Sequence, residues 1–115
     1  MYIFRKIKAM LRLREAIRQA DEARSKDGQR YYVMPTSGTS GQLIIMNREN
    51  FRKLKHKGYI SYTTFVNDLE RECFYCTPYR NGLKGLSPEE QSRKRKQYYS
   101  WVDAIKKMKK LKKNG

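Results

Sequence analysis

Two cysteines are the residues of this chain with the clearest potential for chemistry. Cys73 and Cys76 form the sequence CFYC, a spacing that redox dithiols use and that supplies half of a zinc site. A structural zinc ion needs about four ligands, and the one histidine, His56, belongs to a different predicted element. In an extended segment the two cysteine side chains would also point to opposite faces. We therefore predict buried structural thiols in place of a metal or redox centre.

The sequence TSGTSG at residues 36–41 is the second candidate for chemistry. It resembles the threonine–glycine phosphate loop of adenylate-forming enzymes, and its GTSG has the GxxG form of the KH-domain loop. Those enzymes are several times longer and none of their other motifs is present, while the KH loop joins two helices. Strand-like segments flank TSGTSG, and Gly38 and Gly41 can adopt the dihedral angles of a hairpin loop. We therefore predict a plain hairpin turn.

The sequence offers no recognisable catalytic apparatus. A hydrolase or transferase needs a nucleophile with a base, paired carboxylates or a metal. The 11 acidic residues are scattered along the chain, and His56 lies in a basic run without a carboxylate nearby in the sequence. We therefore predict a protein that is not an enzyme and that uses no cofactor, metal or small-molecule substrate.

Positive charge is the dominant property of the chain. Lys and Arg number 27 against 11 acids, which gives a net charge of +16. This excess is larger than solubility requires, and it points to nucleic acid, an acidic protein surface or, less favoured, an anionic membrane. No apolar run approaches the ~18 residues of a spanning helix, and early cationic residues argue against a secretory signal.

Helical periodicity at both ends predicts two long, basic, amphipathic helices. We divide the chain into an N-terminal arm (1–26), a small α+β core (27–86) and a C-terminal helix (87–115). Gly28 is expected to end the first helix, and Gly58 the helix after the hairpin. The sequence SPEE at 87–90 forms a capping box with proline at the first helical position, which marks the start of the last helix. The stripe predicted for the first helix comprises Ile3, Ile7, Met10, Leu13, Ala16, Ile17 and Ala20. That of the last helix comprises Tyr98, Trp101, Val102, Ile105, Met108 and Leu111.

The core is predicted to be a two-stranded antiparallel hairpin with short helices. The strands are expected at 30–35 and 42–46, and the helices at 47–57 and 63–72. The following CFYCTPY (73–79) is expected to be extended. Both strands are apolar on both faces, and a hairpin of this kind is not stable alone. Either the protein's own helices or a partner must cover each face.

Cationic side chains gather on the long helices and on the helix after the hairpin, where they suit an anion as well as solvent. The predicted nucleic-acid or anion-binding residues are Arg48, Arg52, Lys55, Arg93, Lys94, Arg95, Lys96, Lys106, Lys107, Lys109 and Lys110. Aromatic side chains dominate the energy of buried interfaces. The predicted anchors for a protein partner are Tyr31, Tyr32, Tyr98 and Trp101.

The sequence also resembles a group of phage proteins. The segments RYYVMPT, LIIMNRENFRKLKHKGYI and ERECFYCTPY are similar to small basic open reading frames of crAss-like and related Bacteroides phages, over residues 11–99. The resemblance implies a phage protein, located in the host cytoplasm and then in the virion. We expect a structural or auxiliary virion component that packs on neighbouring subunits in an oligomeric assembly and faces acidic surfaces or packaged DNA.

The alternative is a freestanding nucleic-acid-binding protein that contacts the phosphate backbone. Its centre superficially resembles a helix-turn-helix, in which the second helix enters the major groove. Here the second helix carries three acids, Asp68, Glu70 and Glu72, which makes sequence readout by that helix unfavourable.

Overall fold

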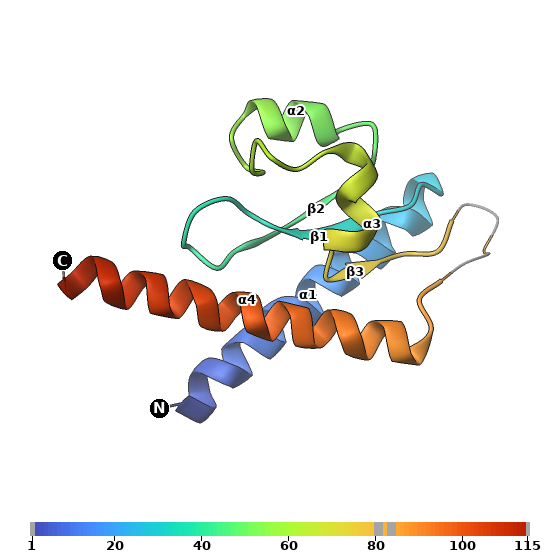
Figure 1. Cartoon of the computed structure of the whole chain (residues 1–115). Coiled ribbons are helices and arrows are strands. Elements are labelled where there is room, and N and C mark those ends of the chain that lie inside the picture. Colours follow the sequence, from blue (N-terminus) through green and yellow to red (C-terminus); the bar gives the residue numbers. More distant parts are fainter. Residues whose placement is uncertain (1, 80–81, 83–84, 115) are drawn as a thin grey trace.

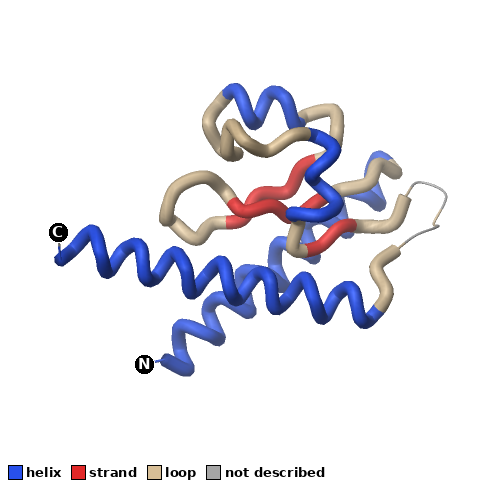
Figure 2. The backbone as a smooth tube through the Cα atoms, in the orientation of Figure 1, coloured by secondary structure: helices blue, strands red, loops and turns tan. Residues whose placement is uncertain are grey.

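The computed structural model describes residues 2–79, 82 and 85–114 as an α+β fold with a sheet between two groups of helices (Figure 1, Figure 2). Two long helices, α1 (Tyr2–Asp27) and α4 (Pro88–Asn114), cross on one side of the sheet. The short helices α2 (Phe51–His56) and α3 (Leu69–Glu72) lie on the other. The predicted α+β class and the two long terminal helices are therefore confirmed.

The sheet has three antiparallel strands, so the prediction of a two-stranded hairpin is wrong. The strand order is β2 (Leu43–Met46), β1 (Tyr32–Pro35), β3 (Tyr75–Cys76). The hairpin pairs Val33 with Ile45, and on the other edge Val33 pairs with Tyr75. The third strand belongs to the segment predicted to be extended. It occupies the hydrogen-bonding edge of β1 that a two-stranded hairpin would leave open.

Alternation along the strands divides the apolar side chains between two cores. Towards α1 and α4 point Val33, Leu43, Ile45 and Tyr75. Towards α2 and α3 point Tyr32, Met34, Ile44, Met46 and Cys76. Both faces of the sheet are thus covered by the protein's own helices. Of the two ways to stabilise the hairpin, intramolecular cover is the one that the structure adopts.

Helix α1 buries the later part of the predicted stripe, Leu13, Ala16 and Ala20, but not its earlier part. The buried residues are Ala9, Leu13, Ala16 and Ala20, whereas Ile7 and Met10 of the predicted stripe are exposed. Alanine has the smallest apolar side chain, so the helix backbone can approach the sheet and α4 closely along this line. The side chain of Ile3 lies outside the described residues. The helix ends as predicted at Gly28, which has a φ of 74° and donates its N–H to the Arg24 carbonyl.

Helix α2 begins four residues later than predicted. The Asn47 and Asn50 side chains each accept a hydrogen bond from the other's backbone N–H, at 2.8 and 3.0 Å between the heavy atoms. This reciprocal turn replaces the first helical turn, since Asn side chains compete for backbone partners. The end was predicted correctly: Gly58, with a φ of 84°, donates to Lys55, and Tyr59 donates to Leu54.

The helix predicted at 63–72 is shorter in the structure. It consists of a 3₁₀ turn, η1 (Val66–Asp68), followed by the four residues of α3. Leu69 is buried in the core beside β1. With 6 and 4 residues, α2 and α3 are too short to act as a recognition helix that fills a DNA groove. The helix-turn-helix interpretation of this centre is therefore not supported.

Helix α4 begins at the predicted capping box and packs through Tyr98. The Glu90 N–H donates to Ser87 Oγ at 3.2 Å, and the Ser87 N–H donates to Glu90 Oε1 at 3.3 Å. Tyr98 is fully buried, its hydroxyl donates to the Ala9 carbonyl at 2.7 Å, and its ring meets Phe74 edge-on. One side chain therefore joins α4 to α1 and to the segment leading into β3.

We predict that Tyr98 is a major determinant of stability. Replacing Tyr98 with Phe removes only the hydrogen bond and should lower the free energy of unfolding by about 0.5–1.5 kcal/mol. Tyr98→Ala also removes the buried ring and should cost about 3–5 kcal/mol. Urea denaturation followed by circular dichroism measures both. Tyr99→Phe, at the half-buried neighbouring position, is the control; an equal loss in Tyr99→Phe and Tyr98→Phe would contradict the role of the hydroxyl.

Candidate anion-binding cleft

The two cysteines lie together in the core between the sheet and α3. Cys73 and Cys76 are both buried and reduced, so their predicted burial is confirmed. Opposite faces were expected only for an extended segment, and Cys73 instead lies at the C-terminal cap of α3, so that only Cys76 is in the strand. Among the described residues, no three His, Cys, Asp or Glu side chains are grouped so that they could hold a metal ion.

Two buried cations flank this cysteine pair. Arg30 donates from Nη2 to Cys76 Sγ at 2.9 Å and from Nε to the Thr77 carbonyl at 2.8 Å. Lys94 donates from Nζ to the carbonyl oxygens of Glu70 at 2.7 Å and Cys73 at 2.9 Å. Lys94 therefore neutralises the carbonyl end of α3, where a cation is favourable. The prediction that Lys94 binds an external anion is corrected, because its ammonium group is buried on these carbonyls.

The environment of Cys76 favours its thiolate form. A hydrogen bond from the Cys73 thiol and the neighbouring Arg30 guanidinium lower the pKa of Cys76 to about 7, although burial acts in the opposite direction. The same hydrogen bond, together with burial, raises the pKa of Cys73. The pair thus loses its first proton from Cys76 readily, and the second proton stays on Cys73.

We predict that the lowered pKa of Cys76 makes the free energy of unfolding depend on pH between 7 and 9. The pKa of Cys76 is about 7 in the folded protein against an ordinary value of 9.0. The folded protein therefore holds fewer protons in this range, and the free energy of unfolding should rise with pH, by on the order of 1–3 kcal/mol. This contribution is complete above the ordinary pKa and is lost as the pH falls through about 7.

The measurement is urea denaturation of the wild type and of Cys76→Ser, under reducing conditions, across this pH range. Serine retains a side chain of similar size but does not ionise. The wild type should gain stability relative to the variant as the pH rises. Parallel curves for the two proteins would contradict a lowered pKa of Cys76 in the folded protein.

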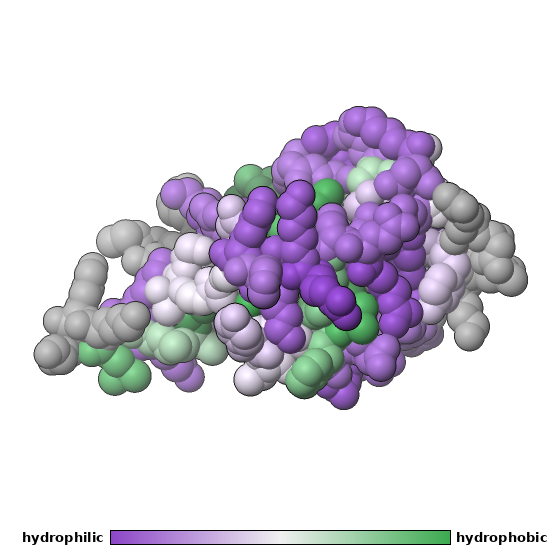
Figure 3. Space-filling model, turned by 90° about the horizontal axis from the view of Figure 1, so that it is seen from above, coloured by the Kyte–Doolittle hydropathy of each residue, from purple (hydrophilic) through white to green (hydrophobic). Residues whose placement is uncertain are grey.

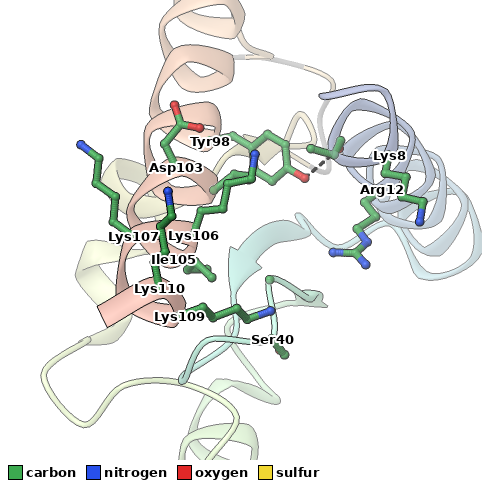
Figure 4. Close-up of a pocket in the computed structure, with 13 residues that line it drawn as sticks. Lys8, Arg12, Ser40, Tyr98, Asp103, Ile105, Lys106, Lys107, Lys109 and Lys110 are labelled. Carbon is green, nitrogen blue, oxygen red and sulfur yellow. Dashed lines mark hydrogen bonds between the residues drawn. The ribbon is translucent and has the colours of Figure 1, made fainter. Parts of the chain in front are cut away.

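A separate feature, at the other end of the long helices, is a cleft of about 1160 Å³. It lies between the first half of α1, the last part of α4 and the hairpin loop, which we define as residues 36–42 (Figure 4). Apolar residues in its lining are Ala9, Tyr98, Val102 and Ile105. The cationic residues in its lining are Lys8, Arg12, Lys106, Lys107, Lys109 and Lys110. Asp103 is the one carboxylate in that lining.

The helix crossing and the hairpin loop position these cations. The hydrogen bond from Tyr98 to Ala9 lies in the cleft lining and holds the two helices together there (Figure 4). Gly41, with a φ of 75°, lets the loop approach α1: an added Cβ would lie 3.3 Å from Arg12 Nη1. Arg12 and Lys109 point towards the space between the helices and the loop, whereas Lys107 and Asp103 point outwards from α4 (Figure 4).

The structure brings together some of the predicted anion-binding residues and separates others. Lys106, Lys107, Lys109 and Lys110 line the cleft. Lys8, Arg12 and the loop residues Ser40 and Gly41 line it too, but were not predicted. The cationic face of α1 and the TSGTSG sequence were visible signals for them. Their proximity to α4 depends on the crossing of α1 and α4, where Tyr98 contacts Ala9, 89 positions away in the sequence. A local sequence pattern does not predict such a contact.

The remaining predicted cations lie outside the cleft lining. Arg52, Arg93, Arg95 and Lys96 are exposed on the surfaces of α2 and α4. Arg48 donates to Asn67 Oδ1 at 3.0 Å. Lys55 is half-buried, donates to the Thr64 carbonyl at 2.6 Å and lies over the Phe65 ring. Lys55 thus has a structural role within the α2–α3 connection.

Two of the four aromatic residues predicted as partner anchors are not at the surface. Tyr32 and Tyr98 are buried in the protein's own two cores, and the prediction is corrected for both. Tyr31 and Trp101 are half-buried and pack against the core between the sheet and the long helices. Tyr31 also donates its hydroxyl to Asp27 Oδ2, which ties the strand to the end of α1.

Comparisons with protein-family models, curated proteins and solved structures gave no match to this chain. None of the helices in the described part of the chain combines the length and the apolarity needed to cross a membrane.

Proposed function

We propose that the protein binds nucleic acid through the phosphate backbone, with the cationic cleft as the principal contact surface. The observation that carries this proposal is the gathering of six Lys and Arg residues from two helices around one cleft that has a single carboxylate in its lining. A net charge of +16 adds a long-range attraction for a polyanion.

The shape of the cleft strengthens its attraction for phosphates. Apolar walls of low dielectric concentrate the electric field of the surrounding cations in a concave site. The apolar part of the lining, which includes Val102 and Ile105, offers few polar groups that could read the edges of bases. Binding is therefore independent of sequence and driven by the release of counterions from phosphates.

We predict that Arg12→Gln combined with Lys109→Gln weakens binding to mixed-sequence duplex DNA. These two residues point into the cleft from opposite helices (Figure 4). Removing two phosphate contacts should reduce the slope of log affinity against log salt by about 2, equally for any sequence. Fluorescence anisotropy across a range of salt concentrations measures both affinity and slope.

The matched control is Arg14→Gln combined with Lys26→Gln. It removes the same charges from exposed positions of α1 that do not line the cleft. It should retain most of the affinity and slope. If the control weakens binding as much as the cleft variant does, binding depends on overall charge and the cleft is not the site.

A second role, as a structural or auxiliary virion component of a phage, has its own supporting observation. The apolar stripe of α4 continues beyond the core, where Met108 is 51% and Leu111 72% exposed, and Leu11 of α1 is exposed as well. Exposed apolar side chains of this size suit contact with neighbouring subunits. In this role the cationic cleft faces packaged DNA or an acidic protein surface.

This role predicts that the purified protein self-associates through α4. Light scattering should give a mass above that of the monomer, and Met108→Gln combined with Leu111→Gln should return the protein to a monomer. The control is Ser92→Gln, at a half-buried position near the start of α4. It leaves this apolar stripe intact, so the variant should self-associate like the wild type. A monodisperse wild-type monomer at high concentration would contradict assembly through this stripe.

A further inference from the structure

Three aromatic side chains project to solvent from the segment that joins α2 to α3. Tyr59 is 49% exposed, Tyr62 78% and Phe65 64%. Large aromatic groups normally bury most of their surface, and exposed clusters of them mark sites where a partner binds. We call Tyr59, Tyr62 and Phe65 the aromatic patch. The nucleic-acid contacts proposed above do not use it.

The fold itself holds these rings outwards. Ile60 and Thr64 are buried on either side of Tyr62 and anchor the segment in the core. The Thr64 N–H donates to the Ser61 carbonyl at 3.1 Å and closes a turn at Tyr62. Because Ile60 and Thr64 hold the segment against the core at two points, the residues between and beside them face solvent. The patch is therefore preformed.

Cations of α2 lie beside the aromatic patch. Lys55 places its Nζ 4.6 Å from the centroid of the Phe65 ring and fixes the ring against the helix. Arg52, Lys53 and Lys57 of the same short stretch are exposed. Seen from the α2 side, this surface is mostly hydrophilic, with small hydrophobic areas between the hydrophilic side chains (Figure 3). Ring faces interleaved with cations are the pattern of single-stranded nucleic-acid sites.

The hairpin loop connects the aromatic patch to the cleft. At one end of the loop, Ser37 donates its N–H to the Tyr59 carbonyl at 2.9 Å and its hydroxyl to the Gly58 carbonyl. At the other end, Ser40 and Gly41 line the cleft. The loop thus lies between the α2 side and the C-terminal part of α4 (Figure 1). A polymer leaving the cleft across this loop arrives at Tyr59.

We propose that the aromatic patch binds the bases of a single-stranded nucleic acid whose backbone runs from the cleft across the hairpin loop. This proposal rests on the proposed function, because the cleft supplies the phosphate contacts. Duplex DNA keeps its bases stacked inside the helix, so it cannot use the ring faces. An acidic protein segment would use the cations and leave Tyr62 and Phe65 without a matching planar group. The ligand class is therefore a single strand.

The test compares a labelled oligo(dT) of about 16 nucleotides with a duplex of the same length. In wild type both bind at low salt. Tyr62→Ala combined with Phe65→Ala should weaken oligo(dT) binding about 10- to 100-fold, because each stacked base is lost, and change duplex binding less than about twofold. Tyr62→Phe combined with Phe65→Tyr keeps both rings and should bind oligo(dT) like the wild type. Both side chains are exposed, and urea denaturation checks that each variant is folded.

The outcomes separate this proposal from the one on which it rests. If the wild type binds neither probe at low salt, both proposals are overturned. Suppose that the wild type binds both probes. If the double alanine variant then keeps both affinities, or loses affinity for both probes equally, the aromatic patch does not select single strands. If polyglutamate of equal charge displaces oligo(dT) at equal concentration, the surface recognises acidic polymers in general, which also overturns it.

Discussion

The crossing of α1 and α4 depends on one buried side chain. Tyr98 fills the space between the two helices and Phe74, and its hydroxyl caps a carbonyl of α1. Buried Tyr hydroxyls are favourable only when they find a partner. This requirement fixes where α4 lies against α1, and hence where the lysines that follow Tyr98 face the cations of α1. The cationic cleft is a consequence of the helix crossing.

A second constraint is the burial of two cations, Arg30 and Lys94. Lys94 lies among the carbonyl oxygens at the end of α3, whereas Arg30 contacts the Thr77 carbonyl, the Cys76 thiol and the Tyr79 ring, whose centroid is at 4.0 Å. Such groups are costly unless they are fully hydrogen-bonded. Here they tie β3 and the end of α3 to α4 and β1. A chain with so much positive charge thus uses part of it inside the fold.

Sequence patterns predicted the features that depend on local chemistry. The SPEE capping box, the glycine that ends α1 and the glycine that ends α2 were found because each requires particular residues at fixed spacing. Features that depend on distant contacts were not found. The third strand pairs with residues more than 40 positions away, and the burial of Ala9 in place of Ile7 and Met10 is apparent only once the sheet and α4 are in place. For the same reason only part of the cleft lining was predicted. The lysines of α4 were predicted from the sequence, whereas Lys8 and Arg12 of α1 were not.

An NMR titration tests most directly whether nucleic acid binds in the cleft, as we propose. Backbone amide shifts of the wild type are followed while oligo(dT) is added at low salt. We expect the largest shifts on residues 8–12, on the hairpin loop and on 102–110, the three parts of the chain that line the cleft. Shifts concentrated instead on residues 14–26 and 88–96, with the cleft unperturbed, would contradict binding in the cleft.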